Sequence, residues 1–302
     1  MPHLLSVRNL PIAQILERVR YRQTHPSTPP AQPKGTIALL FYEPSTRTRG
    51  AFEQACVRLS YHPLVLTPDT SSLAKGESLA DTVRTLCAQG ISALVIRHPH
   101  AGAAQTASRF STVPVLNAGD GTHEHPTQAV VDLYTLWEHF GMPNPHQRWL
   151  EGVKVAIVGD IRHSRVARSN ALLLTQLGAT VWFCAPPSLL PDAPFASVGY
   201  THSIEKALQG AHVVMALRLQ TERMEGGFLP HLNAYRRDYQ ITEERLALAH
   251  PDCIVMHPGP IQRGVELDDS VTDGARSRVL AQVQVGLVVR QVCLEYALGE
   301  AS

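Results

Sequence analysis

The sequence is short of the features that mark several protein classes. Its 302 residues include 27 Lys+Arg and 26 Asp+Glu, which leaves a formal net charge of +1. Without an excess of positive charge, nucleic-acid binding gains no support from overall electrostatics. No uninterrupted apolar run approaches the ~18 residues of a membrane span, and the N-terminus lacks a signal-peptide pattern. We therefore expect partners other than nucleic acid or membrane.

Cysteine is scarce, and its five copies do not form a pattern. They are isolated and odd in number: Cys56, Cys87, Cys184, Cys253 and Cys293. Each lies in an apolar or helical context, which favours reduced core residues over a disulfide framework. We expect a cytoplasmic protein.

A dinucleotide fingerprint is also missing. Val158-Gly159-Asp160 ends a predicted strand and invites a nicotinamide-binding interpretation. No G-x-G-x-x-G follows it, so we expect no nicotinamide and no other cofactor.

What the sequence does contain is an alternation of strand and helix signals. Expected strands are 36–41, 63–67, 92–97, 113–116, 153–160, 180–184, 212–217 and 253–256. Expected helices are 46–60, 78–89, 101–110, 126–140, 164–176 and about 279–298, after an amphipathic helix that ends near Arg22. Strands separated by helices predict an α/β fold. We expect two doubly wound parallel-sheet domains with the active site in the crevice between them, at the carboxyl ends of the strands.

The periodic pattern stops at Gly141-Met142-Pro143-Asn144-Pro145-His146, and we expect the break between the two halves there or within the preceding helix. We expect one domain over 1–140 and a second over 141–278. The C-terminal helix, about 279–302, is expected to pack back on the first domain.

The chain is organised around the motif Phe41-Tyr42-Glu43-Pro44-Ser45-Thr46-Arg47-Thr48-Arg49. A buried strand precedes it and a helix follows, with Ser45 as a good N-cap. The start of a helix has unsatisfied N–H donors and partial positive charge, to which this motif adds hydroxyls and guanidinium groups. That combination predicts a phosphate site. The alternative is a capped helix with a solvated basic first turn.

A second motif is Gly119-Asp120-Gly121-Thr122-His123-Glu124-His125-Pro126-Thr127-Gln128. Pro126 suits the first position of a helix, so His125 lies on the preceding loop. His125 and Gln128 can both point into the same crevice. The His-Glu-His triplet, with His98 and His100 nearby, leaves a metal site as an alternative. Because no Cys or carboxylate stands at a zinc-ligand spacing, we expect no metal.

A third candidate is Arg97, in Val95-Ile96-Arg97-His98-Pro99 at the end of a predicted strand. A charge at that place faces the crevice rather than the core. The alternative role is a surface salt bridge.

The segment 45–49 resembles the Ser-Thr-Arg-Thr-Arg signature of the aspartate/ornithine carbamoyltransferase family. His-Pro-x-Gln at 125–128 and the other motifs follow in the family's order, and the resemblance covers nearly the whole chain. It implies that carbamoyl phosphate is bound by Ser45, Thr46, Arg47, Thr48, Arg97, His125 and Gln128. It also implies that Thr48, Arg97 and His125 are catalytic, as donors to the carbonyl oxygen. Three fixed donors would stabilise the negative charge that develops there.

The resemblance further implies a shared active site. In the family, a serine and a lysine of one subunit reach into the site of its neighbour. Ser72 and Lys75, in Ser71-Ser72-Leu73-Ala74-Lys75-Gly76, match best. The implied catalytic unit is a homotrimer.

Three segments of the second half bear on the other substrate. Arg165 begins a predicted helix, Arg218 and Gln220 share one side of an extended segment, and Pro258-Gly259 follows a strand. Two arginines that each grip a carboxylate suit a dicarboxylic amino acid, although each could instead be a solvated or salt-bridged surface residue.

The resemblance implies that these five residues bind L-aspartate, which makes 1–140 the carbamoyl-phosphate-binding domain and 141–278 the aspartate-binding domain. Family members that use ornithine carry His-Cys-Leu-Pro where this chain has His257-Pro258-Gly259-Pro260. The implied products are N-carbamoyl-L-aspartate and phosphate, in pyrimidine (UMP) biosynthesis. Alternatives are another acceptor such as ornithine, or a non-catalytic scaffold homologue. Assembly with regulatory or dihydroorotase chains stays open.

Overall fold

The computed structural model describes residues 2–26, 32–68, 76–220 and 232–300. The chain divides into two compact units, one formed by residues 1–134 and 283–302 and the other by residues 135–282. None of the helices in the described residues is long and apolar enough to cross a membrane.

The first unit is built on a parallel sheet with the strand order β2-β1-β3-β4. Its strands are β1 (Gly35–Phe41), β2 (Tyr61–Leu66), β3 (Ala93–His98) and β4 (Val115–Asp120). Its helices are α1 (Ile12–Thr24), α2 (Thr46–Arg58), α3 (Leu79–Ala88), α4 (Ala103–Phe110), most of α5 (Pro126–His139) and most of α11 (Val279–Leu298), with a short 3-10 turn η1 (Val7–Asn9).

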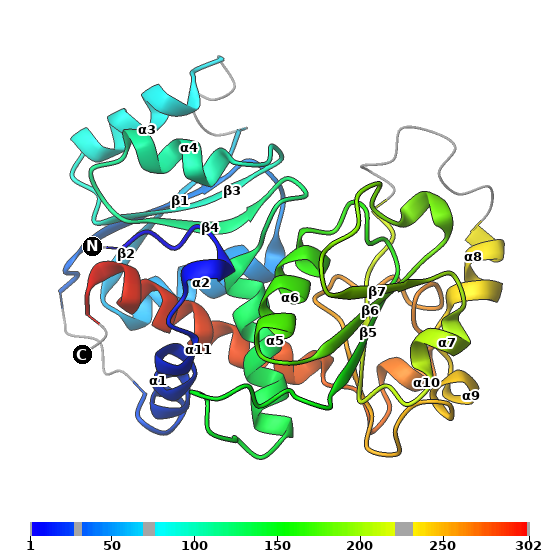
Figure 1. The fold of residues 1–302 in the computed structure, drawn as a ribbon. Helices are drawn as coiled ribbons and strands as arrows, with labels where there is room; N and C mark the ends of the chain where they lie inside the picture. The colour runs from blue at the N-terminus through cyan, green and yellow to red at the C-terminus, as the bar shows by residue number, and fades with distance from the viewer. Residues whose placement is uncertain (1, 27–31, 69–75, 221–231, 301–302) are drawn as a thin grey trace. The chain divides into compact units, whose positions relative to one another are not determined.

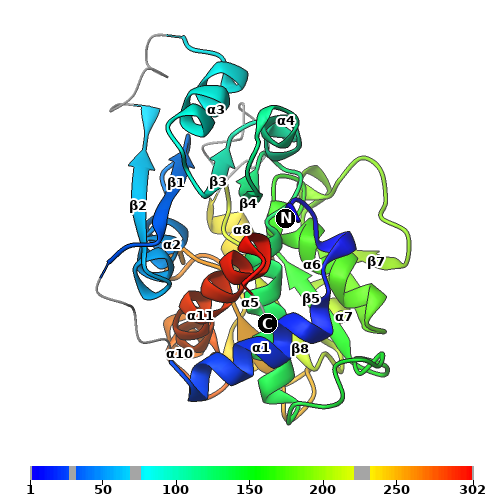
Figure 2. The same ribbon diagram turned by 90° about the vertical axis from the view of Figure 1, so that its left-hand side faces the viewer.

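Helices cover both faces of this sheet because the chain winds in both directions from β1. Figures 1 and 2 show α3 and α4 on one face, with α2, α1 and α11 on the other. Side chains alternate along a strand, so Ala38 and Leu40 of β1 face α3 and α4, where they pack with Val83 and Ala107. The whole run 37–41 is buried, as expected for a central parallel strand.

The two ends of the chain meet on the first unit. The Glu295 side chain of α11, 1 % exposed, pairs with Arg18 and Arg22 of α1 at 3.0 and 2.8 Å. Leu4 forms a parallel bridge to Leu116, which adds the N-terminal segment to the edge of β4.

The second unit is built on a parallel sheet with the order β7-β6-β5-β8-β9. Its strands are β5 (Lys154–Val158), β6 (Thr180–Cys184), β7 (Val198–Thr201), β8 (Val213–Ala216) and β9 (Ile254–Met256). Its helices are α6 (Arg165–Gln176), α7 (Ile204–Leu208), α8 (Leu232–Tyr239), α9 (Glu243–Leu246) and α10 (Asp269–Thr272), with a 3-10 turn η4 (Pro187–Leu189).

The predicted fold class is confirmed, since each unit has a doubly wound parallel sheet between helices. The sequence missed β7, an edge strand of four residues that contains Gly199. A Cβ at Gly199 would lie 2.6 Å from the Trp182 ring, so the glycine lets the ring pack flat on the backbone. A short strand with a glycine in place of an apolar side chain gives no apolar run to detect.

Candidate active site

The predicted residues of the first unit gather where its sheet changes winding direction. The chain leaves β1 toward β2 on one side and later returns to β3 on the other, so the switch point lies between the carboxyl ends of β1 and β3. Open α/β sheets bind their ligands at such points. Phe41 is in register with Arg97, and Tyr42 N donates to Arg97 O at 2.9 Å. The phosphate motif and Arg97 therefore follow neighbouring strands at one edge.

The motif after β1 forms the start of α2. Ser45 is its N-cap, in extended conformation, and its Oγ accepts from Thr48 N at 3.3 Å. Thr46 and Arg47 are exposed. Arg49 pairs with Glu53 one turn along at 3.0 Å, whereas no ion pair is seen for Arg47 within the described part of the chain. Backbone amides, the helix dipole and the Arg47 cation together suit an anion.

Thr48 and His125, 77 residues apart, are brought together by the fold. Thr48 Oγ1 lies 3.4 Å from His125 Nε2, and both residues are buried. His125 directly precedes α5, and its other ring nitrogen lies 3.5 Å from Thr127 Oγ1. The Thr48 hydroxyl of α2 and the His125 imidazole thus face each other beside the proposed anion site at the start of α2.

The loop before His125 is held by the buried carboxylate of Asp120. It accepts from Gly102 N at 2.7 Å and from Asn117 Nδ2 at 2.8 Å, and His123 Nδ1 lies 3.1 Å away. Burial acts to raise the pKa of Asp120, but the hydrogen bonds from His123 and Asn117 outweigh it and leave that pKa below its usual value. Sequence reasoning gave Asp120 no role.

The three side chains of the His-Glu-His triplet have different hydrogen-bond partners. His123 faces Asp120, His125 faces Thr48, and Glu124 accepts from Ser6 Oγ at 2.7 Å and from Val7 N at 2.8 Å. Glu124 therefore anchors the N-terminal segment. In the described ranges, no group of three or more His, Cys, Asp or Glu is placed to hold a metal ion.

Arg97 is held at the end of β3 by two neighbours. Its Nε lies 3.5 Å from Glu43 Oε2, and its Nη1 donates to Ala118 O at 3.5 Å. Both charged side chains are partly exposed, so Arg97 stands at the rim of the sheet edge rather than in the core.

The Gln128 side chain is held between Asp132 and Arg290. Its Nε2 donates to Asp132 Oδ1 at 2.8 Å, and its Oε1 accepts from Arg290 Nη2 at 3.2 Å. The remaining residues predicted for carbamoyl phosphate, Ser72 and Lys75, lie outside the described residues.

The second unit repeats the same arrangement at its own switch point, between the carboxyl ends of β5 and β8. Gly159 follows β5 with φ 132, and a Cβ there would lie 2.4 Å from Leu217 O. Only glycine allows this close approach of the two strand ends. Arg165 comes from the loop and helix after β5, and Arg218 and Gln220 come from the segment after β8.

Asp160 ties those two segments together. Its carboxylate lies 2.9 Å from His163 Nδ1 and accepts from Gln220 N at 3.2 Å. Gln220 Nε2 in turn donates to His163 O at 3.0 Å. Arg165 is the first residue of α6, after the N-cap Ser164, and is buried, so it is not a solvated surface residue at the helix start.

The two aspartates share a sequence signal that could have revealed them. Both units carry Gly-Asp-x-x-His directly at the end of a buried strand, as Gly119-Asp120-Gly121-Thr122-His123 and Gly159-Asp160-Ile161-Arg162-His163. In both, the histidine Nδ1 faces the aspartate three residues before it.

A third segment follows β9, the neighbour of β8. His257 Nδ1 accepts from Gly259 N at 2.8 Å, and its Nε2 lies 3.1 Å from Glu266 Oε1, with both side chains buried. Because Nδ1 accepts, the ring proton is on Nε2 and points to the carboxylate. This pair shapes the turn that carries Pro258 and Gly259.

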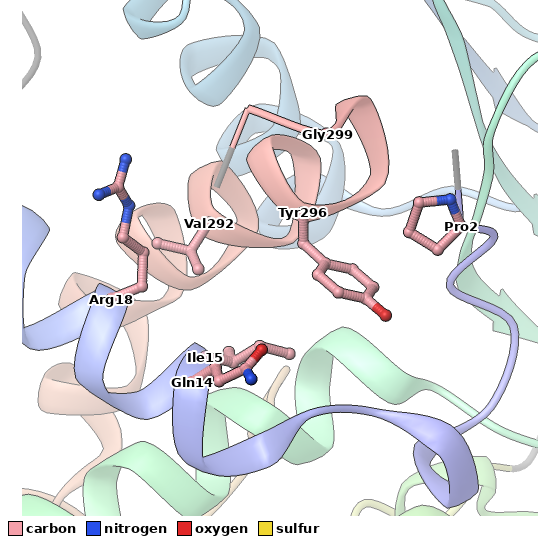
Figure 3. A pocket seen from close by; sticks show the side chains of 7 residues that line it. All are labelled: Pro2, Gln14, Ile15, Arg18, Val292, Tyr296 and Gly299. Atoms are coloured by element: carbon pink, nitrogen blue, oxygen red, sulfur yellow. The ribbon is translucent and has the colours of Figure 1, made fainter. Parts of the chain in front are cut away.

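A cavity of about 350 Å³ lies elsewhere in the first unit, between α1 and α11. Figure 3 shows Arg18 at one end and Pro2 at the other, with Tyr296 between them. None of the predicted site residues lines it.

Comparison with known proteins identifies the family. Residues 3–138 match the model of the "Aspartate/ornithine carbamoyltransferase, carbamoyl-P binding domain", and residues 151–297 match that of the "Asp/Orn binding domain". The aspartate carbamoyltransferase catalytic subunit of Sorangium cellulosum is 52% identical over 269 residues, 88% of this chain and 81% of the relative. That of Desulforudis audaxviator is 47% identical over 302 residues, 97% of this chain and 96% of the relative.

Solved structures agree in fold. Ornithine carbamoyltransferase from Thermus thermophilus has a TM-score of 0.84 at 26% identity, covering 99% of both chains. Aspartate transcarbamoylase from Trypanosoma cruzi in complex with carbamoyl aspartate and phosphate has a TM-score of 0.82 at 28% identity, covering 97% of this chain and 94% of that one. The chain belongs to the aspartate/ornithine carbamoyltransferase family.

Proposed function

We propose that this protein transfers the carbamoyl group of carbamoyl phosphate to the amine of L-aspartate, giving N-carbamoyl-L-aspartate and phosphate. The carrying observation is that relatives about half identical to it over most of the chain are named aspartate carbamoyltransferase catalytic subunits. The fold by itself does not select the acceptor, because enzymes named for ornithine and for aspartate match it about equally well.

Carbamoyl phosphate is assigned to the first unit, in a domain over 1–140 with the C-terminal helix. Its phosphate binds the start of α2 through Ser45, Thr46, Arg47 and Thr48, where amides and a cation converge. Its carbonyl oxygen is bound by Thr48, Arg97 and His125. The 3.4 Å separation of Thr48 Oγ1 and His125 Nε2 supports two of these donors acting on one atom. Gln128 binds the carbamoyl group.

L-Aspartate is assigned to the second domain, 141–278. Arg165 and Arg218 flank the switch point between β5 and β8, and each guanidinium can grip one carboxylate in two places. Gln220 is fixed beside them through Asp160 and His163. Pro258 and Gly259 lie on the turn after β9, the next strand along.

Catalysis then consists of positioning and charge stabilisation. The neutral amine nitrogen attacks the carbonyl carbon, and the negative charge that develops on the carbonyl oxygen is stabilised by Thr48, Arg97 and His125. When the tetrahedral intermediate collapses, the bond from carbon to the phosphate oxygen breaks. The leaving phosphate accepts the proton that the amine gives up, so no side chain need be a general base.

The same proposal includes the protein's assembly and place in the cell. Ser72 and Lys75 of one subunit complete the site of the next, so the working unit is a homotrimer in the cytoplasm. The reaction serves pyrimidine biosynthesis. The protein needs no metal or cofactor, and any regulatory or dihydroorotase chains add to a complete catalytic trimer.

The test is product formation by purified protein given carbamoyl phosphate with L-aspartate and, separately, with L-ornithine. Carbamoyl aspartate plus phosphate is the expected result. Citrulline as product would overturn the proposal that L-aspartate is the acceptor, but not the proposal that carbamoyl phosphate is the donor. No product with either acceptor, despite binding of carbamoyl phosphate, would contradict the proposal and point to another acceptor or to a scaffold.

A further inference from the structure

A buried guanidinium lies behind the proposed carbamoyl site. Arg290 of α11 is 3% exposed and reaches two other helices. Its Nη2 donates to Gln128 Oε1 of α5 at 3.2 Å, and its Cζ lies 5.9 Å from the centre of the Phe52 ring of α2. Its Nη1 donates to Gly286 O, one turn back, at 2.8 Å. Burial lowers the pKa of Arg290 to about 10, so the group is still charged at neutral pH.

The sequence makes room for this arrangement with a glycine. A Cβ at Gly286 would lie 2.7 Å from Arg290 Nη1. Any larger residue there would push the guanidinium off its present position. Placing a glycine inside α11 lowers helix stability relative to alanine, and the position of Arg290 explains why a glycine is there.

Arg290 and Asp132 leave the Gln128 amide only one orientation. A carboxylate accepts from its nitrogen and a guanidinium donates to its oxygen. Turning the amide over would set NH₂ against the cation and C=O against the carboxylate, which are both repulsive. Each end of the amide can still make one further hydrogen bond, through a lone pair on Oε1 and through the second N–H of Nε2. A carbamoyl group offers the matching NH₂ donor and C=O acceptor.

We propose that Arg290 is a positioning residue that fixes the Gln128 amide so that it distinguishes a carbamoyl group from other acyl groups. The inference rests on the proposed function, since it takes carbamoyl phosphate as the ligand. A site built to pair with an NH₂ group rejects an analogue that lacks it, because its own polar group is then left unpaired. Acetyl phosphate, with CH₃ in place of NH₂, is that analogue.

The experiment compares Arg290→Met and Gly286→Ala with the wild type. Gly286→Ala keeps the charge and displaces the guanidinium. Gly50→Ala is its matched control, because Gly50 also lies inside a helix and nothing lies within 4 Å of a Cβ built there. We expect the KM for carbamoyl phosphate to rise about tenfold in both test variants and to stay unchanged in the control. The inhibition constant for inorganic phosphate, which lacks both the NH₂ and the C=O group, should stay unchanged in all three variants. That for acetyl phosphate, which keeps the C=O but lacks the NH₂ group, should rise less in the two test variants than the KM for carbamoyl phosphate does.

A merely structural role predicts another pattern. If losing Arg290 only loosened the packing of α2, α5 and α11, affinity for inorganic phosphate would fall together with that for carbamoyl phosphate, and this result would overturn the inference. A double-mutant cycle adds a second check: in a Gln128→Ala background, Arg290→Met should raise the KM no further. Additive effects would contradict a role through Gln128.

Failure of the inference is distinct from failure of the proposed function. Wild-type protein that makes no carbamoyl aspartate would refute the function. Active wild type with an unchanged KM in Arg290→Met and Gly286→Ala would refute the inference alone.

Discussion

At the scale of single residues, Thr48 offers the sharpest test of the proposed oxyanion site. Thr48→Val keeps the shape of the side chain and removes the hydroxyl that faces His125. Loss of one oxyanion donor lowers kcat about a hundredfold in other enzymes, and we expect a loss of that order. Steady-state kinetics measure it, with Thr48→Ser as the control that keeps the hydroxyl. Equal activity of the valine and serine variants would remove Thr48 from the catalytic group.

Arg165 tests the aspartate site in the same way. Arg165→Lys keeps the charge but cannot grip a carboxylate in two places, so the KM for L-aspartate should rise about tenfold or more. Arg162→Lys is the matched control three residues away, since Arg162 is engaged by Ser188 O and the Asp192 carboxylate. The KM for carbamoyl phosphate should hardly change in either variant. A similar rise in both would contradict a specific role for Arg165.

At the scale of elements, the loop between β4 and α5 depends on one buried carboxylate. Asp120→Asn would set an NH₂ group against a donor in either orientation of the amide, because Gly102 N now donates to Oδ2 and Asn117 Nδ2 to Oδ1. We expect a loss of about 3 kcal/mol in the free energy of unfolding at neutral pH. Urea unfolding of both proteins measures it.

The stability difference between wild type and Asp120→Asn should depend on pH, and the pKa of Asp120 gives the sign. The pKa of Asp120 is lowered from 3.8 in the folded protein. Its stabilising effect is therefore present above pH 3.8 and is lost as the pH falls through the folded value. The difference in unfolding free energy between wild type and Asp120→Asn should narrow below about pH 3.8. A difference that stays constant down to pH 2 would show that the charge of Asp120 is not what stabilises the loop.

Elements were the part of the structure that the sequence predicted best. Strand 180–184 and helix 279–298 appear at those bounds as β6 and α11, because long apolar runs and helical periods report burial directly. The edge strand β7 left no such run. The sequence also predicted that the motif residues at strand ends share one edge of each sheet, because the carboxyl ends of parallel strands lie at the same edge.

Buried polar contacts were beyond sequence reasoning. Nothing along the chain shows that Arg290 reaches Gln128, 162 residues away, or that Glu124 binds Ser6, 118 residues away. Such pairs depend on which faces of distant helices meet, and a lone arginine in an apolar helix has no period to reveal its partner. Asp120 and Asp160 are different, because the repeated Gly-Asp-x-x-His pattern that contains them is visible in the sequence.

At the scale of the whole molecule, the proposed trimer makes a prediction that no single chain can satisfy. If each site takes Arg97 from one subunit and Lys75 from the next, then Lys75→Ala and Arg97→Ala variants are each inactive alone. Hybrid trimers formed from equal amounts of both contain sites whose Arg97 and Lys75 are both intact. Random exchange places both residues in about a quarter of the sites of a closed ring, so about that fraction of wild-type activity should return on mixing.

The complementation assay needs proof that subunits have exchanged. A charge tag on one variant resolves the hybrid species by ion exchange, and a mixture of tagged and untagged Arg97→Ala subunits serves as the control that forms hybrids but restores no site. Recovery that appears only in the mixed Lys75 and Arg97 hybrids would establish sharing between subunits. Verified hybrids without activity would mean that each chain carries a complete site, and the requirement for a trimer would fall with it.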